Sequence, residues 1–189
     1  NMNDSHFVML VGGKDGSFAH ILSYLGVRDE LLSSPADKKR VSAIYYISEE
    51  GKIYLHDNQY LPETYLPETK EDLMNGTCIE WIEFIGRLIE SNDYIFSLLY
   101  GIEGKGGYYQ GMTQILNLPG NFGSVFYASI TKSKWALSFI APRLSQGLVH
   151  CPDTWVLSSN PTKFEMNSVL KELDGRPAII KPNSLGYSR

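Results

Sequence analysis

Residues 94–111 read YIFSLLYGIEGKGGYYQG, and this stretch decides the fold class that the sequence predicts. Its first part, Tyr94–Leu99, is an apolar run without alternation, which is typical of a strand covered on both faces in a parallel sheet. A loop with glycines at positions 101, 104, 106 and 107 follows, and residues 108–118 have the pattern of a helix. A strand, a glycine-rich turn and a helix form half of a βαβ unit, and such sheets bind ligands beyond the carboxyl ends of their strands. Taken alone, the loop is equally consistent with a tight turn that binds no ligand.

A second element of the same kind opens the chain. Residues 6–11 (HFVMLV) predict a short strand, and GGKDG at positions 12–16 predicts a turn. Ser17 is a suitable N-cap for an amphipathic helix, and Gly26 is its expected stop. The turn has the spacing of neither a dinucleotide fingerprint nor a P-loop, so by itself it predicts no phosphate site.

The middle of the chain predicts a strand at Val41–Ile47 and then carries a tandem YLPET repeat at positions 60–69. The prolines of the repeat exclude a central strand or a helix interior, so we expect a surface loop. Thr77–Glu80 has the T-x-x-E pattern of a capping box. The helix behind it has a broad apolar face that we expect to pack on the sheet, made of Cys78, Trp81, Ile82, Ile85, Leu88 and Ile89.

The last third predicts a second α/β layer. Residues 124–140 predict a helix that is either continuous or interrupted near Thr131, and strands are expected at Thr154–Leu157 and Arg176–Lys181. A break at residues 118–121 precedes this layer, which predicts two domains, residues 1–120 and 121–189.

Two lysines in the second domain are candidate phosphate ligands. Lys181 ends a predicted strand just before PNSLGYSR, and a fixed cation beside a loop of backbone N–H groups suits a nucleotide phosphate. Lys134, on an upstream helix, could supply a second cation. The plainer alternatives are an ordinary polar loop and a solvated helix lysine.

Composition narrows the function classes. The net charge is −4 and no basic patch is present, which argues against nucleic acid as the main partner. No apolar run reaches the roughly 18 residues of a membrane helix, and no signal peptide is evident, so we expect a cytoplasmic protein that does not interact with membranes. Cys78 and Cys151 match no metal-ligand spacing and are expected to be buried free thiols.

Several short motifs in one order resemble a known family. They are VGG at 11–13, YG at 100–101, GKGGYYQG at 104–111, LP at 118–119, SK at 133–134, the segment Gly147–Trp155, and KPNSLGYSR at 181–189. In this order the chain resembles the amino-terminal portion of the D-alanine–D-alanine ligases, members of the ATP-grasp superfamily. The resemblance implies an α/β fold, in which a parallel-sheet, Rossmann-like pre-ATP-grasp domain is followed by the start of an ATP-grasp domain.

The resemblance also implies roles for particular residues. Lys134 and Lys181 would bind the phosphates of ATP, and Gly186, Tyr187 and Ser188 would begin the loop that closes over them. Ser17 and Tyr100 would face the amino-acid substrates. The implied reaction forms a dipeptide through an acyl phosphate, as in peptidoglycan synthesis for the cell wall, and a homodimer is expected. The Mg²⁺ ligands would follow Arg189, so we expect an amino-terminal fragment that is inactive alone.

The chain departs from the family pattern at several of these positions. Ser17 stands in the place of a glutamate, Tyr100 of a histidine, Lys105-Gly106 of an acidic pair, Ser133 of an aspartate and Tyr187 of a serine. A tyrosine hydroxyl can donate a hydrogen bond, but it does not carry the charge of a cationic histidine. Two alternatives therefore stay open: a ligase of the same superfamily with another amino-acid substrate, and a non-catalytic module for small-molecule binding or dimerisation.

Overall fold

The structure is a computed structural model that describes residues 6–14 and 19–183. The chain divides into two compact units, Asn1–Ala128 and Ser129–Arg189, and each is described by itself. Ser17, Gly186, Tyr187 and Ser188 lie outside the described residues.

Unit 1 is built on a five-stranded sheet in the order β4-β3-β2-β1-β5. Its strand β1 pairs in parallel with β2 on one side and with β5 on the other, whereas β3 pairs antiparallel with both β2 and β4. The α/β fold class is therefore confirmed, although the sheet is mixed. The strands are β1 (Phe7–Gly12), β2 (Val41–Ile47), β3 (Ile53–Asp57), β4 (Thr77–Ile79) and β5 (Tyr94–Ser97).

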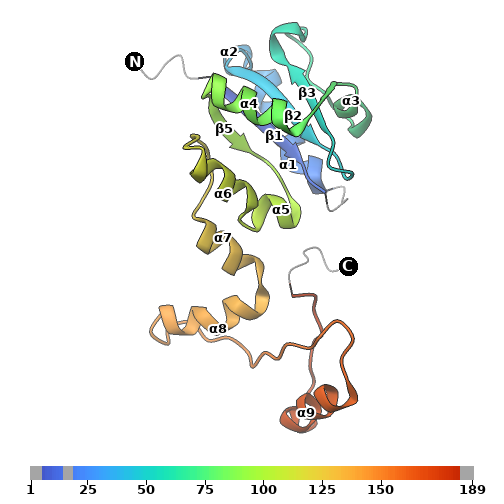
Figure 1. The fold of residues 1–189 in the computed structure, drawn as a ribbon, viewed down its shortest axis with the longest axis vertical. Helices are drawn as coiled ribbons and strands as arrows, with labels where there is room; N and C mark the ends of the chain where they lie inside the picture. The colour runs from blue at the N-terminus through green and yellow to red at the C-terminus, as the bar shows by residue number, and fades with distance from the viewer. Residues whose placement is uncertain (1–5, 15–18, 184–189) are drawn as a thin grey trace. The chain divides into compact units, whose positions relative to one another are not determined.

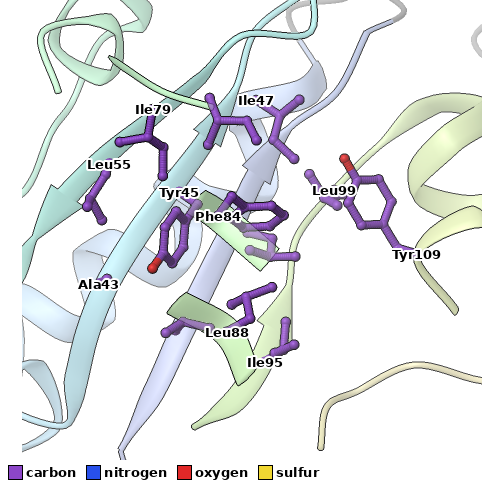
Figure 2. Close-up of a cluster of buried hydrophobic side chains, with 13 residues drawn as sticks. Ala43, Tyr45, Ile47, Leu55, Ile79, Phe84, Leu88, Ile95, Leu99 and Tyr109 are labelled. Carbon is purple, nitrogen blue, oxygen red and sulfur yellow. The ribbon is translucent and has the colours of Figure 1, made fainter. Parts of the chain in front are cut away.

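Helices cover both faces of this sheet (Figure 1). Side chains of α1 pack into one buried cluster and side chains of α4 into the other. Figure 2 shows the second cluster, in which Phe84 and Leu88 of α4 lie against the strands. The helices of unit 1 are α1 (Ala19–Ser33), α2 (Pro35–Lys38), α3 (Lys70–Met74), α4 (Trp81–Ser91), α5 (Gly101–Lys105) and α6 (Tyr108–Ile115), with a 3-10 turn η2 (Asn58–Tyr60).

Strand β5 lies at an edge of the sheet. Tyr94 at the start of β5 is 43% exposed, whereas Ile95 is fully buried, so the apolar run is covered less completely than the sequence predicted. A polar side chain partly covers this edge: the Asn121 amide accepts a hydrogen bond from the Ser97 N–H at 2.7 Å and donates one to the Ser97 carbonyl at 3.2 Å. An edge strand needs such cover because its free backbone groups would otherwise pair with another chain.

The predicted capping box at Thr77–Glu80 was wrong. Thr77–Ile79 forms β4, and α4 starts at Trp81 with Glu80 as an N-cap whose side chain makes no capping hydrogen bond. The apolar face of the helix also differs from the prediction, because Ile82 is 84% exposed and Phe84 is fully buried. Pairing with β3 outweighed the local helix signal.

Two further expectations about loops and breaks were wrong. Helix α1 continues through Gly26 to Ser33, and a Cβ at Gly26 would meet no atom within 4 Å. The YLPET repeat is not wholly a surface loop, because Leu66 of its second copy is fully buried and the Tyr24 hydroxyl donates to the Pro67 carbonyl at 2.8 Å. The two copies of the repeat therefore serve different structural roles.

Unit 2 contains helices and irregular segments. Helix α7 (Val125–Lys132) crosses the unit boundary, and α8 (Lys134–Leu144) and α9 (Lys163–Leu173) follow. The interruption expected near Thr131 is confirmed, with Ser133 between α7 and α8. The strands predicted at Thr154–Leu157 and Arg176–Lys181 do not form in the described structure. A strand needs hydrogen-bonded neighbours, and no described segment of unit 2 pairs with either one.

Apolar side chains remain on the surface of unit 2. Within its described residues none is buried, and Ile179 and Ile180 are 81% and 86% exposed. Cys151 is partly exposed and Cys78 of unit 1 is exposed; both are free thiols, but the expected burial was wrong. Across the described helices, no segment combines the length and apolar character needed to cross a membrane.

Candidate functional site

The carboxyl ends of three parallel strands meet at Gly12–Gly13. The backbone N–H of Tyr100, after β5, donates to the Gly12 carbonyl at 3.1 Å, and the Gly13 N–H donates to the Ile47 carbonyl at the end of β2 at 2.9 Å. The first glycine turn and the segment after β5 are thus neighbours, as their places after two parallel strands predicted.

Glycine is required at both positions of this turn. Gly12 has φ +98° and Gly13 has φ +135°, where side chains are strained. A Cβ on Gly12 would lie 2.2 Å from the Ile47 carbonyl oxygen, and one on Gly13 would lie 2.7 Å from that of Tyr100. The three strand ends therefore approach one another more closely than a side chain at either position would allow.

Charged side chains border the turn. The Lys14 ammonium lies 3.3 Å from a carboxylate oxygen of Glu103, and the Lys105 ammonium lies 3.5 Å from the centre of the Tyr100 ring. The ring face attracts the cation electrostatically. Tyr100, predicted to contact substrate, thus holds a lysine beside the glycine turn.

The start of α6 adds buried polar groups. The Tyr109 hydroxyl and the Gln110 amide oxygen have no hydrogen-bond partner among the described residues, whereas the Gln110 amide nitrogen donates to the Gly104 carbonyl at 3.1 Å. Burial, and secondarily the charge of Glu103, raises the pKa of the Tyr109 phenol, which stays protonated at neutral pH. Tyr109 belongs to the same buried cluster as Leu99 (Figure 2). Buried polar atoms without partners are uncommon, which marks this helix start as part of the candidate site.

Unit 2 brings the segments of both predicted phosphate lysines together. The Lys134 ammonium donates to the Pro182 carbonyl at 2.7 Å, and the Lys134 backbone N–H donates to the Asn183 carbonyl at 3.0 Å. Lys181, the residue before Pro182, is exposed. The start of α8 and the end of the described chain are therefore joined, although Lys134 and Pro182 are 48 residues apart in sequence.

Ser133, which stands in the place of the family's aspartate, is the N-cap of α8. Its hydroxyl accepts from the Ala136 N–H at 3.2 Å, and Ser and Asp are comparable N-caps. The same hydroxyl donates to the Asn183 side-chain oxygen at 3.2 Å. Sequence reasoning missed Asn183, because nothing in the residues around it signals a partner so far back in the chain.

The two groups of candidate residues lie in different units. Tyr100 belongs to unit 1, and Lys134 and Lys181 belong to unit 2. Among the described residues, no three His, Cys, Asp or Glu side chains are grouped to hold a metal ion.

Parallel strands that end together at a glycine turn define unit 1 as a Rossmann-like α/β unit. No protein-family model matches the chain. In sequence it is similar to the D-alanine–D-alanine ligase of Staphylococcus epidermidis, with 28% identity over 194 residues, which cover 99% of this chain and 52% of the relative.

Solved ligase structures share the fold. The D-alanine–D-alanine ligase from Coxiella burnetii matches 97% of this chain and 54% of its own, with a TM-score of 0.65 and 20% identity. The enzyme from Bacillus anthracis complexed with ATP matches 95% and 48%, with a TM-score of 0.55 and 18% identity.

The resemblance to the amino-terminal portion of D-alanine–D-alanine ligases is therefore confirmed. The chain spans about half the length of the curated relatives it matches.

Proposed function

We propose that the protein is an ATP-dependent carboxylate–amine ligase of the D-alanine–D-alanine ligase type. The observation that carries the proposal is the contact between the Lys134 ammonium and the Pro182 carbonyl, one residue after Lys181. The similarity to a ligase over nearly the whole chain supports the same reading. The assignment of residues 121–189 to the start of an ATP-grasp domain is part of the proposal.

In the proposed site, Lys134 and Lys181 bind phosphate oxygens of ATP. The Lys134 ammonium already donates to a neutral carbonyl, and a charged phosphate oxygen is a stronger acceptor. Two fixed cations stabilise the charge that develops on a transferred phosphoryl group. Gly186, Tyr187 and Ser188 are proposed to cover the phosphates, and Ser17 to face the first substrate.

The proposed reaction has two steps. A carboxylate oxygen of one amino acid attacks the γ-phosphorus of ATP, which gives an acyl phosphate and ADP. The amine of a second amino acid then attacks the acyl carbon, phosphate leaves, and the amine loses a proton. Among the described residues no three His, Cys, Asp or Glu side chains are grouped to hold a metal ion, so no step is assigned to Mg²⁺.

A ligase with a different amino-acid substrate is the second candidate. It is favoured by the Lys105–Tyr100 contact, which puts a cation beside the glycine turn where the family has an acidic pair. Such a change alters which charged groups a substrate can place there.

ATP-dependent ligation requires a compartment that contains ATP, so we propose that the protein acts in the cytoplasm. On the resemblance to the ligases, a homodimer and a role in cell-wall synthesis are also part of the proposal.

The test is ATP affinity of the full-length protein, by calorimetry, for wild type, Lys181→Ala and the control Lys171→Ala. Lys171 lies on α9, is exposed, and has no ion-pair partner among the described residues. Loss of a charge-assisted phosphate contact is expected to weaken binding by about tenfold or more in Lys181→Ala only. Negligible ATP binding by wild type would favour the non-catalytic module.

The substrate is tested by ADP release from the same protein with a panel of amino acids. Release with D-alanine supports the first candidate. Release with another amino acid but not with D-alanine supports the second.

A further inference from the structure

Asn183 forms a clamp between the end of the described chain and the start of α8. Its side-chain oxygen accepts from the Trp135 N–H at 3.0 Å and from the Ser133 hydroxyl at 3.2 Å. Its backbone carbonyl accepts from the Lys134 N–H at 3.0 Å. One residue therefore engages three consecutive positions of another segment.

These contacts meet a requirement of the helix. The first N–H groups of a helix have no partner within it. In α8 the first two such groups, of Lys134 and Trp135, donate to Asn183, and the third, of Ala136, donates to Ser133. Asn183 thus completes the helix start from a position 48 residues further along the chain.

The contacts of Asn183 affect the positions of Lys134 and Lys181. Lys134 is the first residue of α8, and Lys181 lies two residues before Asn183. Only short lengths of chain separate each lysine from the clamp, so the clamp sets how far apart their backbones lie. We propose that Asn183 is a positioning residue that holds Lys134 and Lys181 at the spacing a bound triphosphate requires. The inference rests on the proposed function but assigns Asn183 no phosphate contact.

The experiment compares Asn183→Ala and Asn183→Asp with the control Asn160→Ala in the full-length protein. Asn160 is exposed in the same unit, and its side chain makes no hydrogen bond among the described residues. Hydrogen exchange of the Trp135 amide reports the clamp, and calorimetry reports ATP affinity. Asn183→Ala is expected to expose the Trp135 amide to exchange and to weaken ATP binding by about tenfold.

Asn183→Asp keeps a side-chain oxygen that can accept both hydrogen bonds, and a carboxylate suits a helix start. It is expected to retain Trp135 protection. In about 0.5 M salt, which screens its added charge, its ATP affinity is expected to be closer to wild type than that of Asn183→Ala. A residue with a merely structural role would change the melting temperature without this graded effect on ATP affinity.

A second variant separates capping from clamping. Ser133→Asp keeps an N-cap acceptor for Ala136, removes the donor to the Asn183 oxygen and installs the residue of the family pattern, so it is expected to keep α8 capped and to retain ATP binding. The proposal is overturned if wild type binds ATP and Asn183→Ala binds it equally well, or if Ser133→Asp weakens ATP binding as much as Asn183→Ala does. Failure of wild type to bind ATP would instead overturn the proposed function.

Discussion

Truncation of Phe84 tests where the core of unit 1 lies. Phe84 is fully buried, and its ring centre lies 5.0 Å from that of Tyr45 and 5.6 Å from that of Trp81 in edge-on contacts. Replacing a buried phenylalanine by alanine costs roughly 3–5 kcal/mol. The better helix propensity of alanine returns about 0.5 kcal/mol, so the expected loss is about 2.5–4.5 kcal/mol.

The matched control is Ile82→Ala on the same helix. Ile82 is 84% exposed, so the expected change is within about 0.5 kcal/mol. Hydrogen exchange of the slowest β1 and β2 amides measures the free energy of unfolding of unit 1 in each variant. A loss in Ile82→Ala equal to or larger than that in Phe84→Ala would refute the assigned orientation of α4.

The remaining predictions concern backbone strain and pH. Gly26→Ala is expected to stabilise α1 by about 0.5–1 kcal/mol, whereas Gly13→Ala is expected to destabilise the protein by roughly 1–3 kcal/mol. The reason is that only Gly13 has a positive φ and a carbonyl oxygen where the Cβ would lie. Thermal melts that rank the two variants in the reverse order would contradict this prediction. Burial raises the pKa of Tyr45 to about 12, so the contribution of its protonated phenol to the free energy of unfolding is complete below pH 10 and is lost as pH rises toward 12. Tyr45→Phe should remove that part of the loss of stability at alkaline pH, measured by urea unfolding at each pH. Hydrogen bonds from the Thr162 backbone N–H and hydroxyl lower the pKa of Glu165, so the α9 cap stabilises the helix above the usual glutamate pKa, and this stability is lost as pH falls through the lowered pKa. Amide exchange in α9 between pH 6 and 3 should show this loss in wild type and not in Glu165→Gln.

Elements with strong local signals could be predicted from the sequence. The apolar run before Gly12 forms β1, and the turn at Gly12–Gly13 lies beside Tyr100, because parallel strands end at one edge. The break expected near Thr131 lies at Ser133, which is a good N-cap for α8.

Features that depend on distant partners could not be predicted. Thr77–Ile79 became a strand because β3 was available to pair with it, which no local pattern shows. Residues 176–181 have a strand's composition, yet no described neighbour pairs with them. The Asn183 clamp was hidden for the same reason, since its hydrogen bonds join segments far apart in the chain.

The claim that Lys134 and Lys181 bind one triphosphate is tested most directly by chemical protection. Full-length protein is labelled with an amine-reactive reagent at increasing ATP concentrations, and the modified lysines are quantified by mass spectrometry. We predict that ATP slows labelling of Lys134 and Lys181 with the same half-saturating concentration and leaves Lys171 unchanged. Protection of neither lysine, or of the two at clearly different ATP concentrations, would contradict a shared phosphate site.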